Sequence, residues 1–282
     1  MRINTNVSSL NAQESAINTN ANVSSSLEKL SSGLKINKAS DDASGLAIAD
    51  KLRTQATSIN QGVDNGNSAV ALLQIADKSM AEQSNILDTI KAKLIQANTS
   101  TTSSDGRAAI ADDVSKLLDQ LDNIAAQTNY NGTYLLQENA TSSAASTALS
   151  FQIGEKSTDT ISTAAITSNV TGLGLTSIRT SVDAGGISVS LAGTAQTTVD
   201  TAITTLNSNR SEIGSTQNQV ESAVRNLMTQ ATNVTAAESI IRDVDYAQES
   251  ANFNKQNIIS QAGSYAISQA NASQQNVLRL LQ

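Results

Sequence analysis

The chain has 282 residues and a formal net charge of −7, and it contains no proline, cysteine, histidine or tryptophan. Aromatic residues make up 2% of the chain, too few for a large globular core, and the absence of proline leaves long helices uninterrupted. Without cysteine and histidine there are no disulfides, no ordinary zinc ligands and no usual general base for neutral pH. The common catalytic routes are therefore closed, although carboxylates or a Ser/Lys pair would still suffice for an enzyme. Our expectation is no enzyme, no metal and no cofactor.

The charge is unevenly distributed along the chain. Residues 1–43 and 240–282 each carry equal numbers of basic and acidic side chains, so the middle of the chain carries the whole negative excess. Neutral ends can pack against copies of themselves without repulsion, while an acidic middle stays solvated. Windows of this length also sum to zero by chance in many chains. The acidic balance argues against nucleic-acid partners, and the lack of a long apolar run argues against membrane insertion and a signal-peptide core.

The N-terminal segment has an amphipathic pattern with a phase shift near its middle. Its apolar positions are Ile3, Val7, Leu10, Ile17, Val23, Leu27, Leu30 and Leu34. The segment is too polar to form a stable helix alone, so we expect it to order against another helix or another copy of the chain. The turn-forming residues 35–42 follow and offer an N-cap for a helix that begins near Ala43.

Residues 48–94 keep an unbroken spacing of four and three that predicts one very long helix, roughly 70 Å at about 1.5 Å per residue. Its apolar seam includes Ile48, Leu52, Ile59, Leu73, Met80, Leu87 and Leu94. Gly62 and Gly66 lie on the seam and favour close helix approach; a phosphate loop is the alternative, but no Lys-Ser/Thr follows. A polar loop at 98–106, with Ser104 or Asp105 as the expected cap, leads to an antiparallel helix over 110–124.

After Thr128 the periodicity changes from helical to alternating. Tyr130-Asn131-Gly132 predicts a turn, and residues 151–153, 160–162 and 187–191 predict short strands separated by glycines. These segments form an expected hairpin insert at about 130–195. Helical spacing then returns over 199–241, with seam residues Ile203, Leu206, Ile213, Val220 and Leu227.

The C-terminal segment is again amphipathic, with apolar positions Ile258, Tyr265, Val277, Leu280 and Leu281. The overall expectation is a mainly α fold with a small β-hairpin region, in which a long antiparallel coiled-coil-like rod is joined to paired terminal helices. The expected inner helical domain comprises residues 1–43 and 240–282, and the expected rod domain comprises residues 44–239.

Several motifs also have catalytic or metal-binding interpretations. Asp41-Asp42 and Asp112-Asp113 resemble acid pairs, but they have no further ligand cluster and fit helix caps or solvated faces better. Arg210 and Glu238 are charged residues on the third seam, where such residues more often set helix register than perform catalysis.

Six strings of the sequence are distinctive in combination. They are residues 31–37 (SSGLKIN), 41–49 (DDASGLAIA), 127–132 (QTNYNG), 209–214 (NRSEIG), 241–247 (IRDVDYA) and 275–278 (QNVL). Together they closely resemble bacterial flagellin. The similarity covers about residues 1–137 and 197–282. The outer domains of long flagellins are missing, and Gln274 stands where many flagellins have proline.

The resemblance implies a structural subunit that polymerises into the extracellular bacterial flagellar filament and serves motility, exported without a cleaved signal peptide. Implied partners are many copies of the chain, a flagellar export chaperone on the C-terminal helices, and filament cap and junction proteins. The implied subunit interface of the inner domain comprises the apolar positions of the two terminal segments. Alternatives are a hook–filament junction protein, a minor flagellin, or an additional adhesin role; the proline-containing Asp-Asp region of junction proteins is absent here.

Some flagellins present a face that the flagellin-sensing Toll-like receptor recognises, and residues 87–96 match that stretch. Thr89 and Ala92 stand where that branch has an arginine and an acidic residue. We therefore expect a degenerate receptor-binding face at Asp88, Thr89, Lys91, Ala92 and Lys93, with weak or absent signalling.

Overall fold

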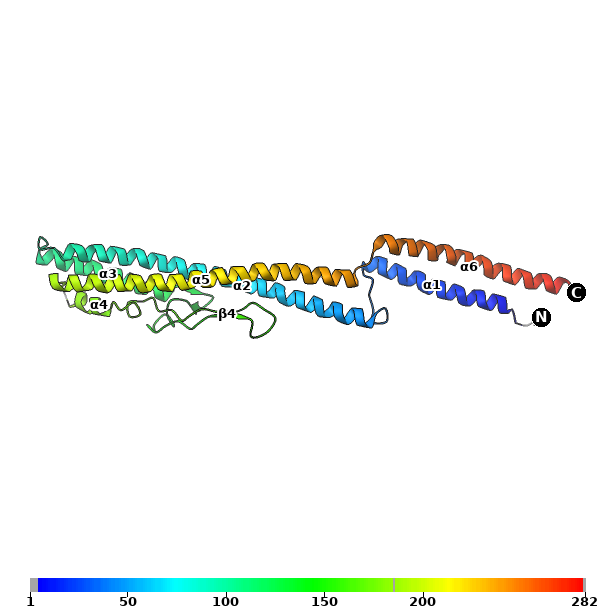
Figure 1. The fold of residues 1–282 in the computed structure, drawn as a ribbon, viewed down its shortest axis with the longest axis horizontal. Helices are drawn as coiled ribbons and strands as arrows, with labels where there is room; N and C mark the ends of the chain where they lie inside the picture. The colour runs from blue at the N-terminus through cyan, green and yellow to red at the C-terminus, as the bar shows by residue number, and fades with distance from the viewer. Residues whose placement is uncertain (1–4, 185, 281–282) are drawn as a thin grey trace. The chain divides into compact units, whose positions relative to one another are not determined.

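A computed structural model describes residues 5–184 and 186–280. The described chain is mainly helical, with two small antiparallel strand pairs (Figure 1), which confirms the predicted fold class. The helices are α1 (Val7–Ser32), α2 (Ala43–Ala97), α3 (Ser104–Gln127), α4 (Thr176–Asp183), α5 (Val189–Arg242) and α6 (Tyr246–Leu280). The strands are β1 (Asn129–Tyr130), β2 (Thr133–Tyr134), β3 (Ser150–Gln152) and β4 (Thr160–Ser162).

Side-chain caps set several helix boundaries. Asp42 accepts hydrogen bonds from the amides of Ser44 (3.0 Å) and Gly45 (2.9 Å), so α2 begins at Ala43 as predicted. The expected cap of α3 was wrong by one or two residues. Ser103, in an extended conformation, is the N-cap and accepts from the Gly106 amide at 3.1 Å.

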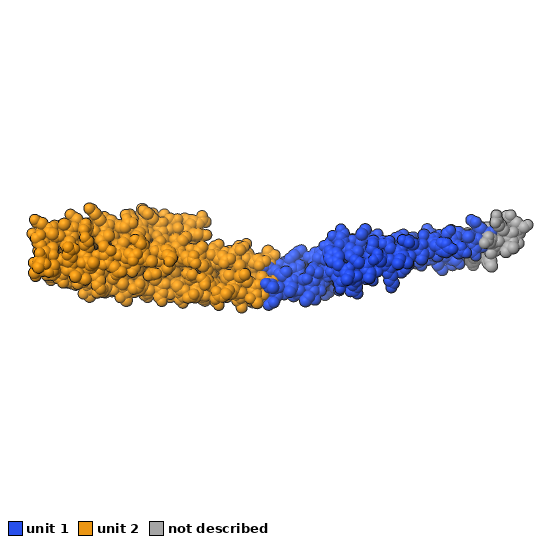
Figure 2. All heavy atoms as spheres, turned by 90° about the horizontal axis from the view of Figure 1, so that it is seen from above, with its two compact units in different colours: residues 1–56, 232–282 blue, residues 57–231 orange. Residues whose placement is uncertain are grey.

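The chain divides into two compact units (Figure 2). The terminal unit comprises Met1–Ala56 and Thr232–Gln282, and the rod unit comprises Thr57–Ala231. The rod unit contains most of α2 and α5, all of α3 and α4, and both strand pairs.

The core of the rod unit lies between α2, α3 and α5, with apolar residues from α4 and the connecting segments added to it. Polar contacts at the edge of this core show the relative directions of the helices. Lys93 of α2 pairs with Asp113 of α3 at 2.9 Å, and Arg210 of α5 pairs with Asp77 of α2 at the same distance. Gln196 of α5 donates to the Leu94 carbonyl. These pairings make α2 antiparallel to both α3 and α5.

Two glycines of α2 lie where a neighbour approaches too closely for a larger residue. A Cβ atom on Gly66 would lie 2.4 Å from Val224 Cγ2 of α5, which is the helix approach predicted for this position. A Cβ atom on Gly62 would lie 1.9 Å from the carbonyl oxygen of Ile153. The segment that follows β3 therefore also packs against Gly62, a contact that the helical spacing did not predict.

The first strand pair is a two-residue hairpin. Asn129 pairs with Tyr134 and Tyr130 with Thr133, and the loop residues Asn131 (φ 51°) and Gly132 (φ 82°) are both left-handed. This is the backbone that Asn-Gly favours in tight hairpins, so the predicted turn is confirmed. The second pair joins residues 150–152 to 160–162 in antiparallel register, near the predicted strands.

The strand expected at residues 187–191 was wrong. Val189 begins α5, and Ser188 accepts from the Leu191 amide through its side chain and from the Ala192 amide through its carbonyl. A strand would place Ile187, Val189 and Leu191 on one face, but Ile187 is buried, Leu191 is half-buried and Val189 is 38% exposed. Five alternating residues are too few to distinguish a strand from the start of a helix.

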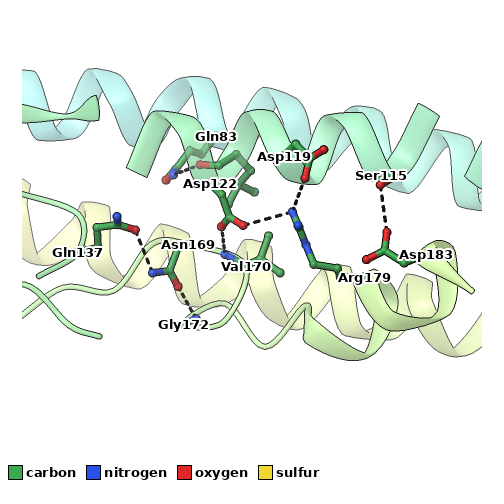
Figure 3. Close-up of polar contacts among 11 residues, drawn as sticks. Gln83, Ser115, Asp119, Asp122, Gln137, Asn169, Val170, Gly172, Arg179 and Asp183 are labelled. Carbon is green, nitrogen blue, oxygen red and sulfur yellow. Dashed lines mark hydrogen bonds and ion pairs between the residues drawn. The ribbon is translucent and has the colours of Figure 1, made fainter. Parts of the chain in front are cut away.

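Buried and partly exposed polar side chains hold the insert against α2 and α3 (Figure 3). Gln83, fully buried on α2, donates to the Leu121 carbonyl (3.2 Å) and the Ser168 carbonyl (2.6 Å) and accepts from the Ser168 hydroxyl. Asp122 of α3 accepts from the Val170 amide at 2.8 Å and pairs with Arg179 of α4 at 3.2 Å. Arg179 also pairs with Asp119 at 2.9 Å. These directional contacts fix the register of a segment that has little regular structure.

In the terminal unit α1 and α6 lie side by side and antiparallel (Figure 1). The Asn6 side chain donates to the Ala270 carbonyl at 3.1 Å. The Ser260 hydroxyl donates to the Asn20 side-chain oxygen at 2.9 Å, and the Ser26 hydroxyl donates to the Glu249 carboxylate near the end of α1. The segment that follows α1 also pairs with the segment that precedes α6. Lys35 donates its amide to the Arg242 carbonyl, and Val244 donates to the Gly33 carbonyl at 3.0 Å.

Candidate assembly surface

The contact between α1 and α6 combines many small side chains with a few large apolar ones. On α1 the half-buried or buried residues recur at spacings of three and four: Ser9, Ala12, Ala16, Thr19, Val23, Ser26 and Leu30. On α6 the corresponding face is Phe253, Gln256, Ser260, Gly263, Ile267 and Ala270. A Cβ atom on Gly263 would lie 3.9 Å from Ala16 Cβ, so the backbones approach closely there.

Large apolar residues of both helices remain exposed as a result. Val7, Leu10, Ile17 and Leu27 of α1 are 53–62% exposed, and Ile258 and Tyr265 of α6 are 67% and 74% exposed. A polar helix with this many exposed large apolar side chains is unusual for a surface that stays in water. We call these six residues the terminal apolar face.

Other residues expected at the subunit interface lie elsewhere or are not described. Leu30 and Leu34 are half-buried within the terminal unit. Ile3 and Leu281 lie outside the described residues, as do the side chains of Val277 and Leu280.

Most residues of the predicted rod seam are buried in the rod unit. These are Ile59, Leu73, Met80, Leu87, Leu94, Leu206, Ile213, Val220 and Leu227. Ile203 is half-buried against the core. Leu52, in the terminal unit, is half-buried, and Ile48 is 50% exposed. Placing Ile48 on the buried seam was therefore wrong; Ala49 is the fully buried residue there, so the buried stripe is out of phase with the prediction at this end of α2.

The stretch compared with a receptor-binding face divides into exposed side chains and ion-paired ones. Asp88, Thr89 and Ala92 are exposed, and the Thr89 hydroxyl donates to the Asn85 carbonyl at 2.9 Å. Lys91 pairs with Asp200 at 2.5 Å and Lys93 with Asp113 at 2.9 Å, both within the rod unit. The Lys93 ammonium also holds the pKa of the Asp113 carboxyl below its usual value, through the hydrogen bond and the charge.

The motifs with catalytic or metal-binding interpretations have structural partners. Asp41 accepts from the amides of Asn37 and Lys38, both at 3.0 Å, and these bonds lower the pKa of its carboxyl. Arg210 pairs with Asp77, and Glu238 lies 3.9 Å from Arg242 in the same helix. Across residues 5–184 and 186–280, no cluster of three or more potential ligands suits a metal ion, and no helix has the length and apolarity of a membrane span.

Sequence reasoning missed the small-residue face that joins α1 to α6. Its signal was present, since serine, alanine and threonine recur at helical spacing from Ser9 to Ser26. The large apolar positions were expected to contact either the other terminal helix or another copy of the chain, because apolar periodicity normally marks the buried face.

Comparison with known proteins agrees with this arrangement of helices. The profile of the bacterial flagellin N-terminal helical region matches residues 3–141, and that of the C-terminal helical region matches residues 196–281. A flagellin of Bacillus subtilis is 36% identical over the whole of both chains.

Longer and solved relatives extend the comparison. Flagellin B of Helicobacter pylori is 46% identical over 160 residues, which are 57% of this chain and 30% of that protein, so this chain matches about a third of the longer relative. The crystal structure of Bacillus cereus flagellin is 28% identical, with a TM-score of 0.50, and covers 62% of this chain and 94% of that one. Together the two profiles and the full-length similarity establish that the chain belongs to the bacterial flagellin family.

Proposed function

We propose that this chain is a structural subunit that polymerises into the extracellular bacterial flagellar filament and so serves motility. Membership of the flagellin family supports this function over an enzymatic one. The observation that carries the assembly mechanism is the terminal apolar face, whose six large side chains are more than half exposed. Full-length similarity to a protein named flagellin favours a filament subunit over a junction protein.

Burial of the terminal apolar face between copies supplies the driving force. Fully burying a leucine, isoleucine or valine side chain contributes about 1.5–3 kcal/mol, so a few such contacts per subunit suffice for association. Repetition of one contact by an operator that does not close produces a helical polymer. The proposed inner domain, residues 1–43 and 240–282, has no net charge and so accumulates no repulsion on stacking.

The remaining parts of the proposal follow from family membership. Residues 44–239 form the proposed rod domain, and the subunit is exported without a cleaved signal peptide. An export chaperone covers the C-terminal helices before assembly, and cap and junction proteins contact the filament ends. Exposed residues of α6 such as Ile258 and Tyr265 offer apolar surface that binding of a chaperone would bury.

The test is polymerisation of the purified chain after addition of salt or filament seeds, followed by sedimentation and negative-stain microscopy. We expect filaments from the natural chain, and none from a variant combining Ile17→Ser, Ile258→Ser and Tyr265→Ser. The matched control combines Asn11→Ser, Asn18→Ser and Asn254→Ser, which change exposed polar residues of the same helices and should permit assembly. Normal filaments from the first variant would refute the assembly surface, and no filaments from the natural chain would refute the function.

We also propose that the monomer signals weakly through the flagellin-sensing receptor. Thr89 and Ala92 are exposed and lack charge, and the neighbouring lysines are engaged with Asp200 and Asp113. Loss of an arginine contact at an interface centre costs about 2 kcal/mol or more, roughly a thirtyfold loss of affinity. A receptor-reporter cell assay should show weak signalling that Thr89→Arg with Ala92→Glu partly restores. Strong signalling by the natural monomer would contradict the proposal.

A further inference from the structure

Three pairs in this sequence place an Asn or Asp directly before glycine: Asn65-Gly66, Asp105-Gly106 and Asn131-Gly132. Such pairs are chemically labile, because the glycine amide nitrogen is unhindered and can attack the preceding side-chain carbonyl carbon. The folded structure decides which pair reacts, since the attack requires a free amide and a backbone that can rotate.

Asn65-Gly66 is locked within α2. The Asn65 side chain donates to the Gln152 carbonyl at 3.0 Å and accepts from the Gln61 side chain at 3.1 Å. The Gly66 amide belongs to the continuous hydrogen-bonded helix, and Val224 packs directly over Gly66. Reaction there requires unfolding of the middle of α2.

Asp105-Gly106 is protected differently, in the first turn of α3. The Gly106 amide, which would be the nucleophile, donates to the N-cap hydroxyl of Ser103 at 3.1 Å. The cap must open before this amide can attack, and the side chain is a carboxylate, whose hydroxide leaving group departs less readily than ammonia.

Asn131-Gly132 has neither protection. Both residues are exposed at the tip of the β1–β2 hairpin, where open space surrounds the Gly132 Cα. Within the described part of the chain, neither the Asn131 side chain nor the Gly132 amide makes a hydrogen bond. The hairpin has two residue pairs, extended by one hydrogen bond from the Leu135 amide to the Thr128 carbonyl (3.2 Å). A ladder this short opens easily at its tip.

We propose that Asn131 is a site of spontaneous deamidation in the folded protein. The Gly132 amide loses its proton to hydroxide or water, and its nitrogen forms a bond to Asn131 Cγ. The bond from Cγ to the side-chain nitrogen breaks, and ammonia leaves with a proton from solvent. Water then opens the five-membered succinimide at either carbonyl, giving aspartate or isoaspartate. The net reaction consumes one water and releases one ammonia.

Opening of the hairpin sets the rate. The Gly132 nitrogen reaches Asn131 Cγ only after the backbone has rotated out of its left-handed conformation, so the tight turn slows the reaction relative to an unfolded chain. The isoaspartate product carries one additional backbone carbon, which a two-residue turn cannot accommodate. The change also adds a negative charge just before Leu135 and Leu136, which are buried in the rod core.

The test is timed peptide mapping of the full chain by mass spectrometry at mildly alkaline pH, below its melting temperature. Deamidation adds about one mass unit, and isoaspartate is identified by fragmentation. We expect Asn131 to convert at least about tenfold faster than Asn65, because opening the hairpin costs less than unfolding α2 by more than the ~1.4 kcal/mol that a factor of ten represents. In urea the two Asn-Gly pairs should convert at similar rates.

Two variants serve as matched controls. Asn131→Gln should abolish fast conversion, because glutamine forms its ring far more slowly, whereas Asn65→Gln should leave the rate at Asn131 unchanged. Equal rates at Asn131 and Asn65 in the folded protein would overturn the proposal. So would an Asn131 that stays intact in the folded protein over a period many times longer than the urea-treated chain needs for full conversion.

Discussion

The rod unit and the terminal unit use the same helical spacing in opposite ways. In the rod unit the large apolar residues of the seam, such as Leu73, Leu87 and Leu206, are at most 1% exposed. In the terminal unit several large apolar residues, such as Ile17 and Ile258, are more than half exposed. Serine, alanine and glycine make much of the contact between α1 and α6, with Val23, Leu30, Phe253 and Ile267 half-buried among them. The rod unit buries its large apolar side chains within itself, whereas the terminal unit leaves several of them exposed.

This difference gives the two units different stabilities. A close contact of small residues buries little apolar area per residue, so α1 and α6 gain less from packing together than α2 does from packing on α3 and α5. The terminal helices therefore gain most from contacts that a single subunit cannot supply. The predictions that follow test this contrast.

The largest effect is expected for a charge placed in the rod core. Leu87→Asp should destabilise the monomer by roughly 4 kcal/mol or more, because a carboxylate is buried without a partner in place of a fully buried leucine. Ile17→Asp, on the terminal apolar face, should change the monomer by less than about 0.5 kcal/mol yet prevent assembly. Thermal melting measures the stability of each monomer, and sedimentation measures its assembly. Equal losses of melting temperature in the two variants would contradict the proposed difference between the units.

A smaller loss is expected at the close approach on α2. Gly62→Ala places a Cβ atom against the Ile153 carbonyl and should destabilise the rod unit by about 2–3 kcal/mol. Gly214→Ala, in α5 with open space around it, should instead stabilise by about 0.5–1 kcal/mol through helix propensity. Urea titrations give both values; a neutral Gly62→Ala would mean that the chain after β3 shifts freely.

The buried polar contact at Gln83 should matter less. Gln83→Leu leaves the Ser168 hydroxyl and two carbonyl groups without their partner, while the added apolar contacts offset part of the loss, for a net cost of about 1–2 kcal/mol. Adding Ser168→Ala should recover part of it, because one orphaned group is removed. Strictly additive losses in this double-mutant cycle would show that the two side chains are not coupled.

The smallest effect concerns pH in the turn between α1 and α2. The amides of Asn37 and Lys38 lower the pKa of Asp41, so its stabilising contribution is present above the unfolded value of about 4 and is lost as pH falls through the lower folded value. Corrected for intrinsic rates, hydrogen exchange of these two amides should therefore accelerate below about pH 3. Asp41→Asn should remove this pH dependence, and an unchanged profile would rule out the carboxylate as its cause.

Local signals were sufficient for much of the fold. Asp42 is the predicted kind of residue at the start of α2, and Asn131-Gly132 forms the expected turn. The predictions were wrong where one residue pattern is compatible with two local conformations. Ile187–Leu191 alternates like a strand but leads into α5, and three adjacent polar residues at 103–105 each suit an N-cap, of which Ser103 takes the role.

The candidate site was only partly accessible from sequence. The large apolar residues of the terminal segments could be named, but periodicity does not tell whether a stripe faces a neighbour in the same chain or remains open. Ile48 shows the same ambiguity, because Ala49 beside it is the buried residue. Small residues at equal spacing compete for the contact, and the closer backbone approach decides the outcome.

The sequence by itself determined that long, uninterrupted helices form, where several of them begin, and which family the chain resembles. It could do so because helix periodicity, caps and tight turns depend on residues within a few positions of one another. The tertiary structure decided which face of α1 meets α6, which neighbour fills the space at Gly62, and which Asn-Gly pair is exposed. These depend on residues far apart in the chain, such as Gly62 and Ile153 or Asn65 and Gln152, whose proximity arises only when the helices pack.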